Sequence, residues 1–398
     1  MENTLTSIEN RSRRDISLDY LRATLILMVV AHHSSLAYTT FAHFNPINYL
    51  SSTHPVVDSS RWLFLDYAEN FNDVFFMSLL FCISGIFVWP SLQRHGVLKF
   101  LRQRLMRLGI PFVLGSFFIM PLAYYASWQL TGKDTGYFPF WRQFILTTWI
   151  PGPLWFIWML LLFDVIAAVV FLILSKRLFK IADMICITGK QRPWIIAIVM
   201  FFVCAFLYIP MLARFGFGTW TAFLTLPFVF QVPRFGLYFA WFFWGLLIGY
   251  NRLDKGILSH DGIMAQHWCR WIIGCFIAYN MLVFIPRIPI LTMHLSAKRL
   301  GGIEAILWVV SCVASCFGFF ALFRGTIKKH RLWMDSIARS SYTIYLVHYL
   351  FVLWLQRLFM KQPIHASIKF VLVFLGATFF SWITAQLLLK IPKVNQIL

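Results

Sequence analysis

Ten apolar stretches, each long enough or nearly long enough to cross a bilayer, limit what this chain can fold into. They cover residues 18–40, 73–90, 108–127, 153–175, 193–212, 234–250, 271–287, 303–323, 341–357 and 366–389. A helix needs about 20 mostly apolar residues to cross the ~30 Å hydrocarbon core of a membrane. The composition agrees with a lipid environment, because 60% of the residues are hydrophobic, only 13% are charged and the mean hydropathy is +0.71. We therefore predict an all-α integral membrane protein with about ten transmembrane helices.

The basic residues between these stretches predict the orientation. Of the 35 Lys and Arg residues, 23 lie in loops on the side of the two termini and ten in the opposite loops. Basic loops stay in the cytoplasm, so both termini are predicted to be cytoplasmic. The predicted organisation is a cytoplasmic N-terminal tail (1–17), a transmembrane domain (18–390) and a cytoplasmic C-terminal tail (391–398). The net charge of +20 is scattered in short clusters among apolar runs, which predicts contact with membrane lipids and no nucleic-acid partner.

Ionisable residues in the first span are the first candidates for function, because such groups are costly in lipid. Arg22 and His33 are eleven residues apart, which places them on one helical face and ~16 Å apart along the axis. Asp19 precedes Arg22 by three residues and is expected to pair with it. His32 points about 100° away from His33 and is expected to be a packing residue. The alternative is structural, with an interfacial ion pair and with His33 hydrogen-bonded to a neighbouring helix.

Three further residues have two open interpretations each. Asp164 in the fourth span is either catalytic or a structural partner of an Arg or Tyr. His348 is expected about two turns in from the cytoplasmic end of the ninth span, level with Arg22 and Ser84, where it either lines a pocket or makes a structural hydrogen bond. Trp155 is expected near the outer interface, where an aromatic-belt role is the alternative.

Soluble-enzyme motifs are missing from the sequence. It contains no Walker loop, GxSxG, HExxH or glycine-rich dinucleotide motif. His43, His54, Asp58 and Asp66 in the outer loops match no standard metal spacing. We therefore predict no metal site and no permanently bound cofactor.

Five short segments resemble the motifs of the membrane acyltransferase-3 family and occur in the family's order. RDISLDYLRATLILMVVAHHSS is similar to the first span of that family, whose signature is an Arg, then ten residues, then a His. Here these two residues are Arg22 and His33. The other four are MSLLFCISGIF, FLRQRLMRLGIPF, PGPLWFI and SYTIYLVHY, which carry Ser84, Gly85, Arg104, Arg107, Pro111, Trp155, Ser341, Tyr342 and His348. Typical members have an Asp before the second motif where this chain has Ser78, and the MSLLF form resembles the branch of glucan biosynthesis protein C.

The resemblance implies a membrane-bound O-acyltransferase of the bacterial inner (cytoplasmic) membrane. Such an enzyme transfers an acetyl, succinyl or similar group from cytoplasmic acyl-CoA, its donor substrate, to a hydroxyl of an extracytoplasmic glycan or lipid-linked sugar. A neutral imidazole can deprotonate that hydroxyl, so His33 is the expected general base, with Arg22 as its catalytic companion. Direct attack and an acyl-His33 intermediate are both open. The residues expected to bind substrate are Asp19, Ser84, Arg104, Arg107, Trp155, Tyr342 and His348, with Arg104 and Arg107 on the CoA phosphates.

Two other classes of protein remain as alternatives. A secondary transporter of a small anionic solute also needs charges at mid-membrane depth, but it usually shows inverted repeats and broken helices, and the sequence shows neither. A membrane sensor or scaffold would make His33 dispensable and would bind no CoA.

Overall fold

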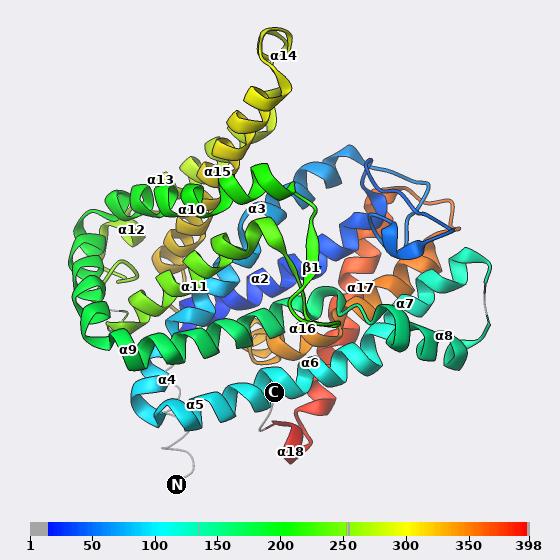
Figure 1. Ribbon diagram of the computed structural model, residues 1–398, viewed down its shortest axis with the longest axis horizontal. Coiled ribbons are helices and arrows are strands. Elements are labelled where there is room, and N and C mark those ends of the chain that lie inside the picture. The colour runs from blue at the N-terminus through cyan, green and yellow to red at the C-terminus, as the bar shows by residue number, and fades with distance from the viewer. Residues whose placement is uncertain (1–14, 134, 252, 254, 396–398) are drawn as a thin grey trace.

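The computed structural model describes residues 15–133, 135–251, 253 and 255–395, and most of them are helical. The all-α class predicted from the sequence is therefore confirmed (Figure 1). The helices of the first half are α2 (Ile16–Ser35), α3 (Leu63–Ile86), α4 (Val88–His95), α5 (Val97–Arg104), α6 (Ile110–Leu114), α7 (Met120–Trp128), α8 (Tyr137–Gln143), α9 (Trp155–Gln191) and α10 (Pro193–Phe215).

The second half continues with a small hairpin and eight helices. Strands β1 (Trp220–Ala222) and β2 (Val229–Gln231) pair antiparallel, with Thr221 opposite Phe230. The helices are α11 (Phe235–Tyr250), α12 (Ile263–Gln266), α13 (Trp268–Phe284), α14 (Pro289–His294), α15 (Ala297–Thr326), α16 (Leu332–Phe359), α17 (Ala366–Leu388) and α18 (Pro392–Asn395).

Eight helical segments among the described residues are long and apolar enough to cross a membrane, against the ten spans expected. They are Leu63–His95, Val97–Thr131, Tyr137–Leu174, Pro193–Phe215, Val232–Tyr250, Trp268–Arg287, Ala297–Thr326 and Ala366–Leu388. The two other expected spans correspond to α2 and α16, which have 20 and 28 residues but more polar side chains. Twelve of the 20 residues of α2 are buried. A helix screened from lipid by its neighbours does not need a uniformly apolar surface.

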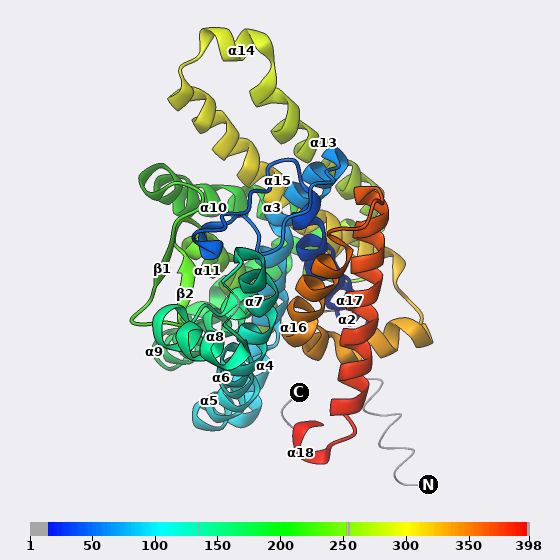
Figure 2. The same ribbon diagram turned by 90° about the vertical axis from the view of Figure 1, so that its right-hand side faces the viewer.

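Helix α2 lies among α3, α15, α16 and α17 near the centre of the molecule (Figures 1 and 2). It runs parallel to α16. The Tyr20 hydroxyl donates to the Asp335 carboxylate, 2.7 Å away, where both helices begin. Where both helices end, the Gln356 side-chain amide donates to the His33 carbonyl at 2.9 Å. These contacts hold the two helices in one register along their whole length.

The long helix that carries α5, α6 and α7 contains two π-helical turns, Leu105–Gly109 and Gly115–Ile119. Pro111 and Pro121 follow them directly, each at the start of the next α-helical segment. Proline cannot donate an N–H to the preceding turn and its ring crowds the carbonyl four residues earlier. A π-turn inserts one extra residue into the helix, so both prolines are accommodated without ending it.

The end of α13, α14 and the first part of α15 project away from the body of the molecule as an arm (Figures 1 and 2). Its side chains are largely exposed and apolar, including Phe284, Ile290 and Met293. The described helices of the main body pack on both sides of α2, and that packing positions the candidate site.

Candidate functional site

Two histidines from different helices meet beside the end of α2. The ring centroids of His33 on α2 and His348 on α16 are 5.4 Å apart. Tyr349 lies edge-on to His33, with the ring centroids 5.0 Å apart. His348 is fully buried, whereas His33 is half-buried. The bundle therefore brings four side chains together, and we call this cluster of His33, His348, Tyr345 and Tyr349 the histidine pocket.

Backbone contacts determine the tautomer of His348. Its Nδ1 lies 2.6 Å from the Tyr345 carbonyl oxygen, and a carbonyl can only accept, so Nδ1 carries the proton. The Nε2 atom then has a free lone pair, and among the described residues it has no hydrogen-bond partner although it is buried. The Nδ1 atom of His33 is likewise buried and without a partner. Two imidazole rings with free ring nitrogens can exchange protons with a substrate placed between them.

The position of His348 along α16 differs from the predicted one. The sequence places His348 level with Arg22 and Ser84, but the structure places it against His33. The reason is that α16 begins at Leu332, which lies ~24 Å from His348 along the helix at 1.5 Å per residue.

A short loop before α9, which contains Gly152 and Pro153, packs against the tyrosines of this cluster. The Tyr345 hydroxyl donates to the Pro153 carbonyl, and a Cβ on Gly152 would lie 3.5 Å from the Tyr124 hydroxyl and 3.5 Å from the Tyr349 ring. Trp149, just before this loop, has a φ of +26°, which is costly for a bulky residue and is typical of functional loops.

Trp155 follows this loop and begins α9. Its ring stacks on Tyr238 at a centroid distance of 5.6 Å and also faces Phe81 in the last third of α3. These contacts place Trp155 in the packing between α3, α9 and α11, and its expected position near the outer interface stays a prediction.

Arg22 and Asp19 form the ion pair that their spacing predicts. Arg22 Nη2 lies 3.1 Å from the Asp19 carboxylate, and 41% of the Arg22 side chain is exposed. Arg22 remains ~16 Å from His33 along α2, so the two residues belong to opposite ends of one helical face.

The second motif contributes a close helix crossing. Ser84 donates its hydroxyl to the Leu80 carbonyl of its own helix, at 2.8 Å. At Gly85 a Cβ would overlap the Phe242 carbonyl of α11, and Gly245 is equally close to the Cys82 carbonyl. Gly85 is therefore needed for the close approach of the α3 backbone to the α11 backbone. Ser84 lies away from the histidine pocket.

The two arginines of the third motif, Arg104 and Arg107, lie in different environments. Arg104 Nε lies 3.3 Å from the carboxylate of Asp164, which is fully buried on α9. Of the two interpretations of Asp164, the geometry matches the structural partner of an Arg. Arg107 is exposed, and its carbonyl accepts from the Tyr342 hydroxyl, so Tyr342 lies with the basic motif and not in the histidine pocket.

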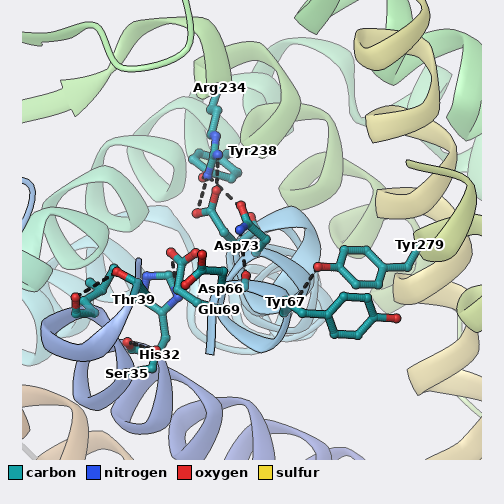
Figure 3. A network of polar contacts seen from close by, with 12 residues as sticks. His32, Ser35, Thr39, Asp66, Tyr67, Glu69, Asp73, Arg234, Tyr238 and Tyr279 are labelled. Carbon is teal, nitrogen blue, oxygen red and sulfur yellow. Dashed lines mark hydrogen bonds and ion pairs between the residues drawn. The ribbon is translucent and has the colours of Figure 1, made fainter. Parts of the chain in front are cut away.

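Sequence reasoning missed a buried polar network on the side of α2 that His32 faces (Figure 3). Arg234 and Asp73 form an ion pair in which Arg234 is only 3% exposed. The Arg234 guanidinium also lies under the Phe217 ring, 4.5 Å from its centroid. His32 Nδ1 lies 3.7 Å from the Glu69 carboxylate, so His32 faces this network while His33 faces His348. Asp66 and Glu69 are the sequence signal of this network, and both lie just before the span predicted at 73–90.

The loop after α2, residues 36–62, is joined to the histidine pocket through Gln356. His54 Nε2 donates to the Gln356 side-chain oxygen at 2.8 Å, and Gln356 in turn donates to the His33 carbonyl. Burial lowers the pKa of His54 to about 4, so this residue is neutral at physiological pH. Asp58 in the same loop accepts from Lys369 at 2.7 Å, and both are almost fully buried. Within the described ranges, no three His, Cys, Asp or Glu side chains come together as metal ligands.

Comparison with known proteins identifies the family. The family model described as "Acyltransferase domain" matches residues 15–386. Proteins named "Glucans biosynthesis protein C" from Salmonella paratyphi B and Salmonella dublin are 27% identical over 198 residues, which is 49% of this chain and 46% of each relative. The match thus spans about half the length of these curated relatives. No solved structure matches this one. Because the family model covers nearly the whole chain, including all five motifs, the chain belongs to the membrane acyltransferase-3 family that its sequence resembles.

Proposed function

We propose that this protein transfers an acyl group from cytoplasmic acyl-CoA to a hydroxyl of a glycan or lipid-linked sugar on the opposite face of a bacterial cytoplasmic membrane. The observation that carries the proposal is the His33–His348 pair, whose rings lie 5.4 Å apart with two ring nitrogens lacking hydrogen-bond partners. Membership in the acyltransferase family supports acyl transfer. The name of the glucan biosynthesis relatives supports a glucan-type acceptor.

The chemistry needs a base and a proton carrier, and two imidazoles provide both. His33 takes the proton of the acceptor hydroxyl, whose oxygen attacks the thioester carbonyl. The carbon–sulfur bond breaks, and CoA leaves as a thiolate that takes up the proton. In the alternative route His33 attacks the thioester, CoA leaves as a thiolate that takes up the imidazole proton, and an acyl-imidazole remains. The acceptor hydroxyl then gives its proton to His348 and attacks the acyl carbon, the carbon–nitrogen bond breaks, and the proton passes from His348 back to His33. The fixed tautomer of His348 fits the proton acceptor of this second route.

The donor binds from the Arg22 end in this proposal. Arg22, Arg102 and Arg107 present exposed or half-exposed guanidinium groups there, and guanidinium groups bind phosphate oxygens with charge-assisted hydrogen bonds. The flexible arm of CoA then carries the thioester along the Arg22–His33 face of α2, a distance of ~16 Å. The acceptor approaches from the end covered by the 36–62 loop.

Acyl transfer in membrane vesicles tests the proposal. Inside-out vesicles that contain the protein and a glucan acceptor are given radiolabelled acetyl-CoA or succinyl-CoA, and label in the glycan is measured. We expect incorporation with the unchanged protein and with His43→Ala, which replaces an exposed loop histidine, and none above background with His33→Ala. Full incorporation by His33→Ala at matched protein levels would contradict the proposed chemistry.

Cysteine labelling tests the orientation separately. In a background with the exposed Cys269 replaced by Ser, single cysteines are placed at the exposed positions Ser51, Gly136, Gly96 and Lys255. A membrane-impermeant reagent added to intact cells, with the outer membrane permeabilised where there is one, should label the first two and not the last two. Labelling at Gly96 would reverse the orientation and move the donor to the other side of the membrane.

A further inference from the structure

A groove of about 1000 Å³ lies between the end of α7, the last turns of α16 and the middle of α17. Its size is at the upper end of ligand sites, which measure ~300–1,000 Å³. Six of its residues carry the argument: Phe351, Trp354, Leu355, Arg357, Lys361 and Phe380. None of the proposed catalytic residues lines it.

The groove changes from basic to apolar along its length. Lys361 lies in the turn that joins α16 to α17, and Arg357 is in the last helical turn before it. Phe351 lies six residues before Arg357, ~9 Å further from that turn. It stacks on Phe380 of α17 at a centroid distance of 5.7 Å. One end of the groove is thus cationic and the other aromatic.

Among the described residues, neither of the two cations has a carboxylate partner in the groove. One Arg357 amino group donates to the Ala126 carbonyl at 2.8 Å, which fixes the guanidinium but leaves its charge uncompensated. Lys361 is exposed. The described residues that line the groove include no Asp or Glu. A ligand that complements this surface carries a negative group at the α16–α17 turn and an apolar chain that points toward the middle of the bundle.

We propose that this groove binds one anionic phospholipid of the surrounding membrane, with its phosphate at Arg357 and Lys361 and one acyl chain against Trp354, Leu355 and the Phe351–Phe380 pair. The long axis of the groove follows α16, which spans the membrane domain, so the basic end lies at headgroup level and the aromatic end in the hydrocarbon. The opposite face of α16 carries Gln356, which is bonded to His33. The lipid therefore borders the helix that holds the histidine pocket without entering that pocket, and the proposal does not depend on acyl transfer.

Lipid retention by the purified full-length protein tests this proposal. The protein is equilibrated in detergent with equal amounts of phosphatidylglycerol and phosphatidylcholine, and bound lipid is counted by native mass spectrometry. We expect one phosphatidylglycerol to be retained preferentially. Arg357→Gln with Lys361→Gln should reduce that preference by roughly 30-fold, the effect of removing two cations near an anionic headgroup.

Matched controls separate a site from general charge effects. Lys298→Gln with Arg299→Gln removes two exposed cations of α15 outside the groove and should leave the preference unchanged. Glycerol 1-phosphate at the same concentration should not displace the lipid, because it lacks the chain that the aromatic end binds. Equal retention of both lipids, equal loss with both double variants, or displacement by glycerol 1-phosphate would overturn the proposal. A size-exclusion profile identical to that of the unchanged protein verifies that each variant is folded.

Discussion

The two ends of α2 carry similar numbers of ionisable groups but satisfy them in different ways. At its beginning, Arg22 pairs with Asp19 at 3.1 Å and is 41% exposed. At its end, His33 lies against His348, and each ring has a buried nitrogen without a partner. An exposed ion pair contributes only ~0–1 kcal/mol, whereas a buried polar atom left without a hydrogen bond costs about 1–3 kcal/mol.

This difference indicates which end of α2 holds the substrate and which end reacts with it. The Arg22–Asp19 ion pair leaves Arg22 Nε without a hydrogen-bond partner among the described residues, but a partly exposed ion pair has a structural explanation that needs no substrate. Unpartnered nitrogens inside a membrane protein reduce its stability, and a substrate that completes their hydrogen bonds explains their presence. The end of α2 is therefore the better candidate for the reacting centre, and its beginning is a better candidate for holding a charged donor.

The largest expected effect is at His33. His33→Ala should reduce the acyl-transfer rate by about 10²–10⁴-fold, the usual loss when a general base is removed. His32→Ala should retain a substantial part of the activity, because His32 faces Glu69 and not His348. The measurement is acyl incorporation into glycan with membrane levels of the variants matched.

His32 is a close control because it is the next residue of the same helix. Equal activity of the two variants, or a loss confined to His32→Ala, would assign the chemistry to the Glu69–Asp73–Arg234 network instead. The contrast between His32, which faces Glu69, and His33, which faces His348, would then no longer identify the base.

Local features of α2 could be predicted from the sequence. Its helical face and the Asp19–Arg22 pair follow from the 3.6-residue period, which needs no information from the rest of the chain. The start of α3 could not be predicted, because Asp66, Glu69 and Asp73 reduce the hydropathy of its first three turns. Those side chains are paired with residues on other elements, such as Arg234, and such pairs depend on tertiary packing.

The pocket itself also depends on packing between distant segments. Helical spacing identified His33, and the motif identified His348, but their contact requires the parallel register of α2 and α16. That register comes from Tyr20–Asp335 at one end and Gln356–His33 at the other. Neither pair has a local sequence signal, since each hydrogen bond joins the two ends of the chain.

The second largest expected effect is a loss of folding stability when the buried ion pair between Lys369 and Asp58 is broken. Lys369→Met leaves the Asp58 carboxylate, which is 1% exposed, without its cation. Breaking a buried pair from one side typically costs about 3–5 kcal/mol. Thermal unfolding in detergent should show the loss, and Lys369→Met combined with Asp58→Asn should recover much of it. A single variant as stable as the unchanged protein would mean that Asp58 is hydrated in the membrane.

A smaller effect separates the two residues of the second motif. Gly85→Ala places a methyl group against the Phe242 carbonyl and should cost about 1–3 kcal/mol of stability, as overpacking does. Ser84→Ala loses a hydrogen bond to its own helix and should change stability by less than about 1 kcal/mol. Thermal unfolding measures both variants. If Ser84 binds substrate, Ser84→Ala raises KM at unchanged stability, and an unchanged KM removes it from the binding residues.

The smallest expected effect is at the third motif, where Arg104 is held in an ion pair and the nearby Arg107 is exposed. Arg107 is exposed, whereas Arg104 already pairs with the buried Asp164. Arg107→Gln should weaken acyl-CoA binding by about fivefold at low ionic strength, since one exposed charge contact contributes up to ~1 kcal/mol and salt screens it. Arg104→Gln should instead lower the melting temperature, because it leaves the Asp164 carboxylate buried without a cation. Binding is measured by calorimetry with a non-hydrolysable acyl-CoA analogue at two salt concentrations. If Arg104→Gln weakens binding while Arg107→Gln does not, Asp164 must release Arg104 to the CoA phosphate, and the ion pair at this end of the molecule would itself be part of donor binding.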